Sequence, residues 1–201
     1  MTTFADGGKS LVGFVRQLTL ADLGPLESLL RSDPVSNCFL DARVRGAGLD
    51  PWRLGGDIWG YLDGDALHSV AYVGANLVPV ATTPASRAAL ADRLRMSPRR
   101  CSSFVGDREE VLDLWRLLEP AWGPAREVRD DQRLLVMDTD ANIPHDPHVR
   151  MATLADMDVL LPACVDMFTE EVGISPVRGG AGSAYRDRVA EIVRAGRSFV
   201  R

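Results

Sequence analysis

The sequence predicts a mixed α/β protein in which helices pack on one mixed sheet, followed by the opening elements of a second, similar lobe. Three observations predict this. Short apolar runs alternate with longer runs whose apolar residues recur every three or four positions. An Asp-Gly pair at 63–64 separates two of the short runs, which is typical of a β-hairpin. An octapeptide near the N-terminus, VRQLTLAD at 15–22, returns as VRMATLAD at 149–156.

The first lobe is expected to open with a strand and a helix. Residues 1–10 are polar and predict a flexible leader. A strand is predicted over 12–18, and Thr19 and Asp22 can then accept backbone N–H bonds at the start of a helix. That helix carries leucines on one face and is expected to end before Pro34.

The next predicted elements are a second helix and a β-hairpin, which has the clearest strand signal in the chain. The helix is predicted over 37–45. The hairpin is predicted from strands at 58–62 and 67–73, because Asp-Gly tolerates the positive φ angles of a tight turn. A further strand is predicted over 77–80.

Two more helices have recognisable starts. Thr83 and Pro84 read as the N-cap and first position of a helix over 85–94. Asp107 is expected to cap the next helix, which Pro120 should end. The acidic residues that crowd this second start are expected to offset the helix dipole: Asp107, Glu109, Glu110 and Asp113.

Strands at 100–105 and 132–137 are expected to complete the first lobe, which we place at 11–138. Residues 139–148 contain two prolines and predict a linker. The remainder, 149–201, is expected to form the truncated start of a second lobe.

The repeated octapeptide is the evidence for this second lobe. Its copies match at six of eight positions and begin 134 residues apart, and each leads from a short apolar run into an apolar-periodic helix. A unit of that length would break off at Arg201, so the chain looks cut short. The second copy is expected to contain a strand at 148–151, a helix at 156–168, a glycine-rich loop at 179–182 and a helix at 184–195.

Composition limits the class of protein. The chain has 201 residues, 46% of them hydrophobic and 25% charged. A chain of this length and composition can bury a hydrophobic core without help from disulfides or bound metals. Its net charge of −5 argues against nucleic acid or an anionic membrane as a partner. Three scattered cysteines suggest neither disulfides nor a metal site, and no run is long and apolar enough for a membrane span. A cytoplasmic location is the expectation.

This order, opening with a V-R-x-x-T-x-x-D strand-to-helix junction, resembles the GNAT superfamily of acetyl-CoA-dependent N-acetyltransferases. It looks most like bacterial tandem proteins in which a degenerate GNAT-like lobe precedes a conventional one. The residues that carry this closer resemblance are Trp52, Gly55, Gly56, Trp59, Gly60 and the stretch 74–80. The resemblance implies attack of a neutral amine on the acetyl-CoA thioester, aided by a base and by a backbone amide that holds the oxyanion.

The family's cofactor motif is Q/R-x-x-G-x-G/A between a strand and a helix, where backbone N–H groups hold the pyrophosphate. In the first lobe this position is 81–85, which contains no glycine, and Pro84 removes one N–H. In the second lobe the motif would lie beyond Arg201. We therefore expect no cofactor-binding residues in this chain, and leave the catalytic residues unassigned.

Two other patterns mimic ligand sites. Arg43, Gly46 and Gly48 spell R-x-x-G-x-G, but they follow a helix, so a helix C-cap is the plainer interpretation. His145 and His148 lie close together in the predicted linker without a third ligand, so we expect no metal site.

The candidate site residues fall in two places. Glu170 and Glu171 occupy the position where the family walls its acceptor-amine pocket, and could attract a cationic amine or act as its base; a solvated helix end is the alternative. Trp52, Trp59 and His68 are weaker candidates for a ligand pocket, since scattered aromatic residues usually serve packing.

The leading hypothesis is the N-terminal portion of an N-acetyltransferase, inactive alone, acting with acetyl-CoA on a small-molecule or peptide amine. The alternative is a non-catalytic binding or regulatory module built on a degenerate GNAT lobe. The incomplete second lobe leaves a sheet edge to be covered, and self-association through it is one way of covering it.

Overall fold

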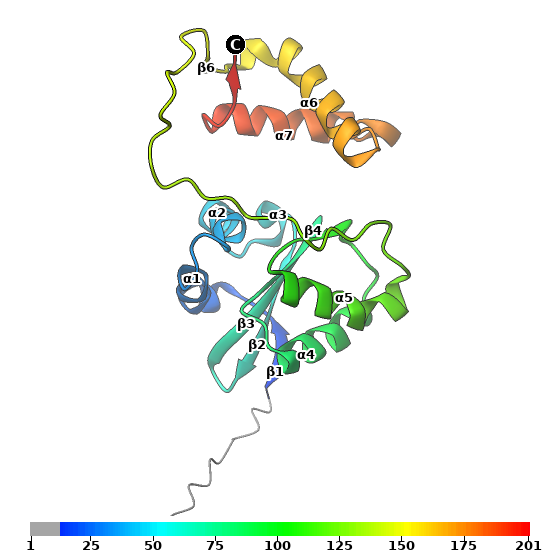
Figure 1. Cartoon of the computed structure of the whole chain (residues 1–201). Helices are drawn as coiled ribbons and strands as arrows, with labels where there is room; N and C mark the ends of the chain where they lie inside the picture. The colour runs from blue at the N-terminus through cyan, green and yellow to red at the C-terminus, as the bar shows by residue number, and fades with distance from the viewer. Residues whose placement is uncertain (1–12) are drawn as a thin grey trace, which may run out of the picture. The chain divides into compact units, whose positions relative to one another are not determined.

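The computed structural model describes residues 13–201, so the leader predicted over 1–10 lies outside the described residues. The chain divides into two compact units at Val136–Met137, close to the predicted linker at 139–148. Each unit has its own sheet (Figure 1). Each unit also has its own hydrophobic core. No helix among the described residues has the length and apolar character needed to cross a bilayer.

Unit 1 is built on a mixed sheet of five strands, which confirms the mixed α/β class. Neighbours in the sheet follow the chain order from β1 to β5; the first four strands are antiparallel and β5 runs parallel to β4. The strands are β1 (Phe14–Gln17), β2 (Asp57–Asp63), β3 (Ala66–Val73), β4 (Asn76–Val80) and β5 (Ser103–Phe104). The β2–β3 hairpin turns at Asp63–Gly64, as predicted.

Helices cover both faces of this sheet (Figure 1). One face packs against α1 (Leu23–Arg31), α2 (Cys38–Ala47) and the short α3 (Pro51–Leu54); the other packs against α4 (Pro84–Arg95) and α5 (Arg108–Trp122). Side chains of β3 alternate between the two cores, since successive residues of a strand point to opposite faces. The sheet is therefore buried on both sides.

Two local predictions were wrong, and one short helix was missed. Helix α5 runs through Pro120 to Trp122, because a proline in the last turn removes only one helical hydrogen bond. Helix α3 was not predicted; Asp50 caps it by accepting the N–H bonds of Trp52 and Arg53. Residues 132–137 form no strand.

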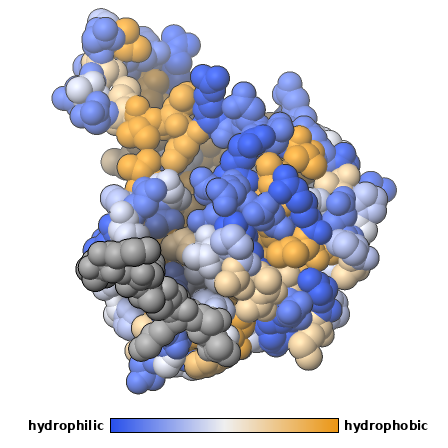
Figure 2. Space-filling model, turned by 60° about the horizontal axis from the view of Figure 1, so that its bottom comes forward, coloured by the Kyte–Doolittle hydropathy of each residue, from blue (hydrophilic) through white to orange (hydrophobic). Residues whose placement is uncertain are grey.

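The segment expected at 132–137 is irregular, and its apolar side chains are exposed. Leu134, Leu135, Val136 and Met137 retain 61%, 86%, 63% and 76% of their accessible surface. A strand exists only when its backbone pairs with a neighbour, and this segment has none among the described residues. Figure 2 shows that hydrophobic side chains reach the surface between hydrophilic ones on the face it displays.

Unit 2 contains two strands and two helices. Strands β6 (Arg150–Met151) and β7 (Phe199–Val200) are antiparallel. Helices α6 (Met157–Val172) and α7 (Gly182–Arg194) pack against one face of the pair through a core that includes Ala152 and Val200. These helices lie where the sequence predicted them, with α6 ending four residues later than predicted.

The repeated octapeptide adopts the same junction in both units. Arg16 donates two hydrogen bonds to the carboxylate of Asp22, at 2.8 and 2.7 Å, and Arg150 makes the same two bonds to Asp156 at the same distances. Each aspartate also accepts the backbone N–H of the threonine three residues before it, at 2.7 and 2.8 Å. These bonds hold the pKa of both carboxyl groups far below the usual range.

Candidate functional site

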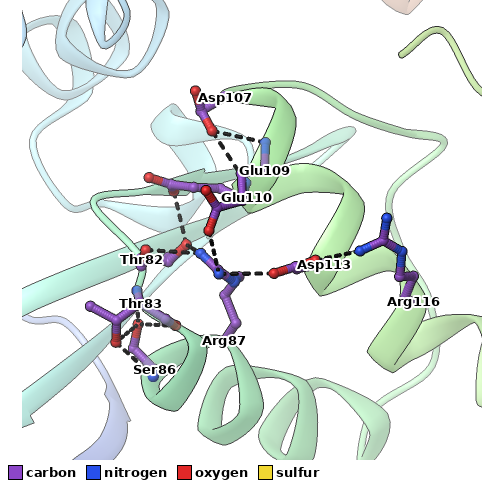
Figure 3. Close-up of polar contacts among 9 residues, drawn as sticks. All are labelled: Thr82, Thr83, Ser86, Arg87, Asp107, Glu109, Glu110, Asp113 and Arg116. Atoms are coloured by element: carbon purple, nitrogen blue, oxygen red, sulfur yellow. Dashed lines mark hydrogen bonds and ion pairs between the residues drawn. The ribbon is translucent and has the colours of Figure 1, made fainter.

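Polar side chains gather where β4 and β5 lead into α4 and α5 (Figure 3). The two strands pair over only two residue pairs, Asn76 with Ser103 and Leu77 with Phe104. Beyond these pairs the chain enters the N-termini of the two helices; residues 81–85, before α4, are where the GNAT resemblance implies a cofactor motif that this sequence lacks. We take this cluster as the candidate site.

The N-terminus of α4 is closed by its own side chains. The backbone N–H of Ser86 donates to Thr83 Oγ1 at 3.2 Å, and the N–H of Thr83 donates to Ser86 Oγ at 2.8 Å. Pro84 has no N–H, and the N–H of Arg87 donates to the Thr83 carbonyl. The backbone N–H groups of Thr83, Ser86 and Arg87 are therefore engaged, and Pro84 supplies none, which leaves few donors for an anion at this helix N-terminus.

Arg87 joins α4 to α5. Its side chain is only 2% exposed, and its Nη2 contacts Glu109 at 3.1 Å and Asp113 at 2.9 Å. Its Nη1 donates to the Thr82 carbonyl at 3.0 Å, while its Nε has no hydrogen-bond partner. Asp113 also accepts from Arg116, so the buried guanidinium lies within a chain of alternating charges (Figure 3).

A second link runs from the end of β4 to α5. Thr82 donates its hydroxyl to Glu110 Oε2 at 2.9 Å. Burial raises the pKa of the Glu110 carboxyl, although the bond from Thr82 acts in the opposite direction. Three carboxylates thus surround the start of the two helices: Glu109, Glu110 and Asp113.

The backbone is strained next to this cluster. Ala81 has a φ of +55°, and it is the one non-glycine residue with positive φ among those the structure describes. Its carbonyl accepts the Ser69 hydroxyl at 2.8 Å, and the same hydroxyl contacts Ser86 Oγ at 3.0 Å. The turn from β4 into α4 is therefore fixed by buried hydroxyl groups. Chemically, this arrangement is suited to holding two helices together rather than to receiving an anionic ligand.

Glu170 and Glu171 lie in the last turn of α6, and both are exposed. The chain then passes through Gly173, which has a left-handed conformation, into an irregular stretch before α7. The two carboxylates are accessible to a cationic molecule, as an acceptor site requires. A solvated helix end has the same appearance, so their role stays a prediction.

Trp52, Trp59 and His68 lie on three different elements. Trp52 on α3 is 95% exposed, and His68 on β3 is exposed. Trp59 on β2 is half-buried beneath the Arg93 guanidinium, 3.9 Å from its ring centre. It lines a cavity of about 60 Å³ that neither Trp52 nor His68 lines. Those two residues therefore do not share the Trp59 cavity.

Gly46 and Gly48 of the R-x-x-G-x-G pattern lie at the end of a helix. α2 continues through Gly46, and Gly48 ends it with a φ of +63° and an N–H bond to the Val44 carbonyl. The Arg43 guanidinium lies over the rings of both Phe39 and Tyr72. Across residues 13–201, no three histidine, cysteine or acidic side chains are placed to hold a metal ion.

Sequence reasoning missed the cluster around Arg87. It assigned the acidic residues of α5 to the helix dipole, whereas Glu109 and Asp113 bind an arginine from another helix. Their spacing of four residues, which places them on one helix face, was the available signal. The partner on α4 had no signal in the local sequence.

One comparison with known proteins gives a match. Residues 56–160 match the family described as "Domain of unknown function (DUF4081)". No curated protein and no solved structure matches the chain. The matched range starts just before β2 and extends into α6, so it includes the candidate site and the junction of unit 2.

Proposed function

Because the chain belongs to the DUF4081 family, whose function is unknown, we propose a function from its own residues. In this proposal, the chain is part of an acetyl-CoA-dependent N-acetyltransferase with two GNAT-like units. Unit 1 is non-catalytic and shapes or covers the acceptor site. Unit 2 is the start of the catalytic unit, and the amine acceptor is a small molecule or a peptide. Residues 1–201 alone do not transfer acetyl groups.

The observation that carries this proposal is the closed N-terminus of α4. A GNAT cofactor site needs free backbone N–H groups at this helix to hold the pyrophosphate. Here the N–H groups of Thr83 and Ser86 are bound by each other's hydroxyl groups, and Pro84 has none. The fold of unit 1 supports a GNAT-like lobe, and its helix start supports a lobe without cofactor.

Charge favours the same conclusion. A pyrophosphate at the start of α4 would lie near three carboxylates, and like charges repel. The nearby cation, Arg87, is buried and already bound to Glu109 and Asp113. It cannot turn toward a ligand without breaking both ion pairs.

The shared junction supports the assignment of unit 2. Both units place an Arg–Asp pair and a threonine between the first strand and the first helix, with matching distances. If unit 2 is the catalytic lobe, Glu170 and Glu171 at the end of α6 are its candidates for contact with the acceptor amine. Two adjacent carboxylates favour a cationic acceptor.

A binding or regulatory module is the second candidate. The exposed apolar run from Leu134 to Met137 favours it, because several adjacent exposed apolar side chains commonly mark a contact with another molecule. Such a module needs no acetyl-CoA and no acceptor.

The test combines intact mass and acetyl transfer on the protein isolated from its native source. We expect radiolabelled acetyl-CoA to label amines in a panel of polyamines, lysine peptides and aminoglycosides. The chain of residues 1–201 serves as the matched control, and acetyl-CoA should not raise its melting temperature. Stabilisation of this control, which grows with the logarithm of ligand concentration, would refute the closed site in unit 1. Absence of transfer by the native protein would favour the binding module.

The two glutamates have their own variant. In the native-length protein, Glu170→Gln with Glu171→Gln should raise KM for a cationic amine, because two charges that attract it are lost. The control is Asp166→Asn, which removes a charge four residues before Glu170 on α6. An unchanged KM for every amine in the panel would remove these residues from the acceptor site.

A further inference from the structure

One face of the two-stranded sheet in unit 2 is bare and apolar. Helices α6 and α7 cover the face that bears Ala152 and Val200. Met151 and Phe199 are direct cross-strand partners and point to the other face, since successive residues of a strand alternate. They are 59% and 61% exposed, and Val149 on the same side is 46% exposed.

The repeat shows which residues of unit 1 are equivalent. Beyond the Arg–Asp junction, the N–H of Leu18 donates to the Ile58 carbonyl at 2.8 Å, and the N–H of Ala152 donates to the Ser198 carbonyl at 2.9 Å. β6 and β7 therefore pair in the register of β1 and β2. The bare residues Val149, Met151 and Phe199 correspond to Val15, Gln17 and Trp59.

In unit 1 this face is covered by α4, which packs against both β1 and β2. Val15 and Trp59 join the core that contains Leu90 and Leu94 of that helix. Arg93 of α4 lies over the Trp59 ring at 3.9 Å. The cover is thus a helix that buries Leu90, Ala91 and Leu94 in this core and places an arginine over the aromatic ring.

We propose that the face formed by Val149, Met151 and Phe199 is covered by a helix of this kind, carried by the same polypeptide. The helix presents an apolar stripe to Met151 and Val149 and a cationic side chain to the Phe199 ring. Its equivalent in unit 1 follows β2 within the same unit, which is why we assign it to the same polypeptide and not to a partner. This inference shares the equivalence of the units with the proposed function, but not acetyl transfer.

Methionine oxidation tests whether the face is covered. Dilute peroxide converts exposed methionine to its sulfoxide, and peptide mass spectrometry reads each site. In residues 1–201, Met151 should react as fast as Met96 at the end of α4, which is 80% exposed, whereas the buried Met157 should not react. In the protein from its native source, Met151 should react at least about tenfold more slowly relative to Met96. An unchanged ratio would overturn the proposal.

Photo-crosslinking tests what covers it. With Phe199→p-benzoylphenylalanine in the native-length protein, crosslinks should fall within one segment of the same polypeptide at helical spacing. Crosslinks to a second copy, to another protein or at every second residue would each overturn the proposal. The failure of the proposed function is separate: it appears as absent acetyl transfer with Met151 still protected.

Discussion

Replacing Asp22 with asparagine should destabilise unit 1 by about 2 kcal/mol, because the side chain loses charge-assisted bonds. Asp22 is 12% exposed and accepts two bonds from Arg16 and two from Thr19. Asparagine keeps one acceptor oxygen and turns an amide N–H₂ toward the guanidinium. Charge-assisted bonds contribute about 1.5–3 kcal/mol each, but Arg16 is 39% exposed and regains water, which lowers the sum.

Tryptophan fluorescence can measure this effect in unit 1 alone, because all four tryptophans lie there. For a unit of this size, about 2 kcal/mol corresponds to a fall in melting temperature of roughly 8 °C. The control is Glu27→Gln, which removes an exposed pair with Arg31 at 3.5 Å and should change stability by less than about 0.5 kcal/mol. Equal melting temperatures for the two variants would refute the reasoning.

The pH dependence of the same variant has a definite sign. The pKa of Asp22 is depressed in the folded protein, so its contribution is complete above the unfolded pKa of about 4 and is lost as pH falls below it. The gap between wild type and Asp22→Asn should therefore narrow from pH of about 6 to about 3. A gap that widens toward acid would contradict the assigned pair.

Three further predictions concern the cluster at α4. Arg87→Met should lower the free energy of unfolding, measured by urea titration, by about 2 kcal/mol, because Thr82 and Asp113 lose a buried partner. The control variant Glu109→Gln should change this free energy little, because the Glu109 side chain is 76% exposed. Ala81→Gly should raise the melting temperature, because glycine removes a left-handed strain of about 1 kcal/mol; a lower value would mean that the strain is absent. Because burial raises the pKa of Glu110, ionisation of this carboxyl group lowers the stability of the folded protein as pH rises. Glu110→Gln should therefore be more stable than wild type at neutral pH, and the difference should vanish in acid. Urea midpoints of both proteins at the two pH values test this sign.

Local chemistry made most of the fold predictable. Asp63 and Gly64 fix the hairpin turn, and Thr83 with Pro84 fixes the start of α4, because each feature depends on residues adjacent in sequence. The strand predicted over 132–137 failed for the opposite reason. Its apolar composition permits a strand, but pairing depends on a distant edge that the local sequence does not reveal.

The site was less predictable than the fold. The absence of glycine at 81–85 predicted a helix start without a phosphate loop, but it did not predict which contacts form there. Arg87 reaches Glu109 and Asp113 across 22 and 26 residues, and charged residues on exposed helix faces rarely reveal such partners. The octapeptide predicted the repeat, yet its internal Arg–Asp pair became apparent only in the structure.

The Arg87 cluster also determines what unit 1 would need in order to bind an anion at the start of α4. Removing Glu109 and Asp113 would free the guanidinium, but its side chain is 2% exposed and still bound to the Thr82 carbonyl. The hydroxyl groups of Thr83 and Ser86 would continue to occupy the backbone N–H groups, and Pro84 would still lack one. Several changes must therefore occur together before a pyrophosphate is held, since each feature removes a different donor from the helix start.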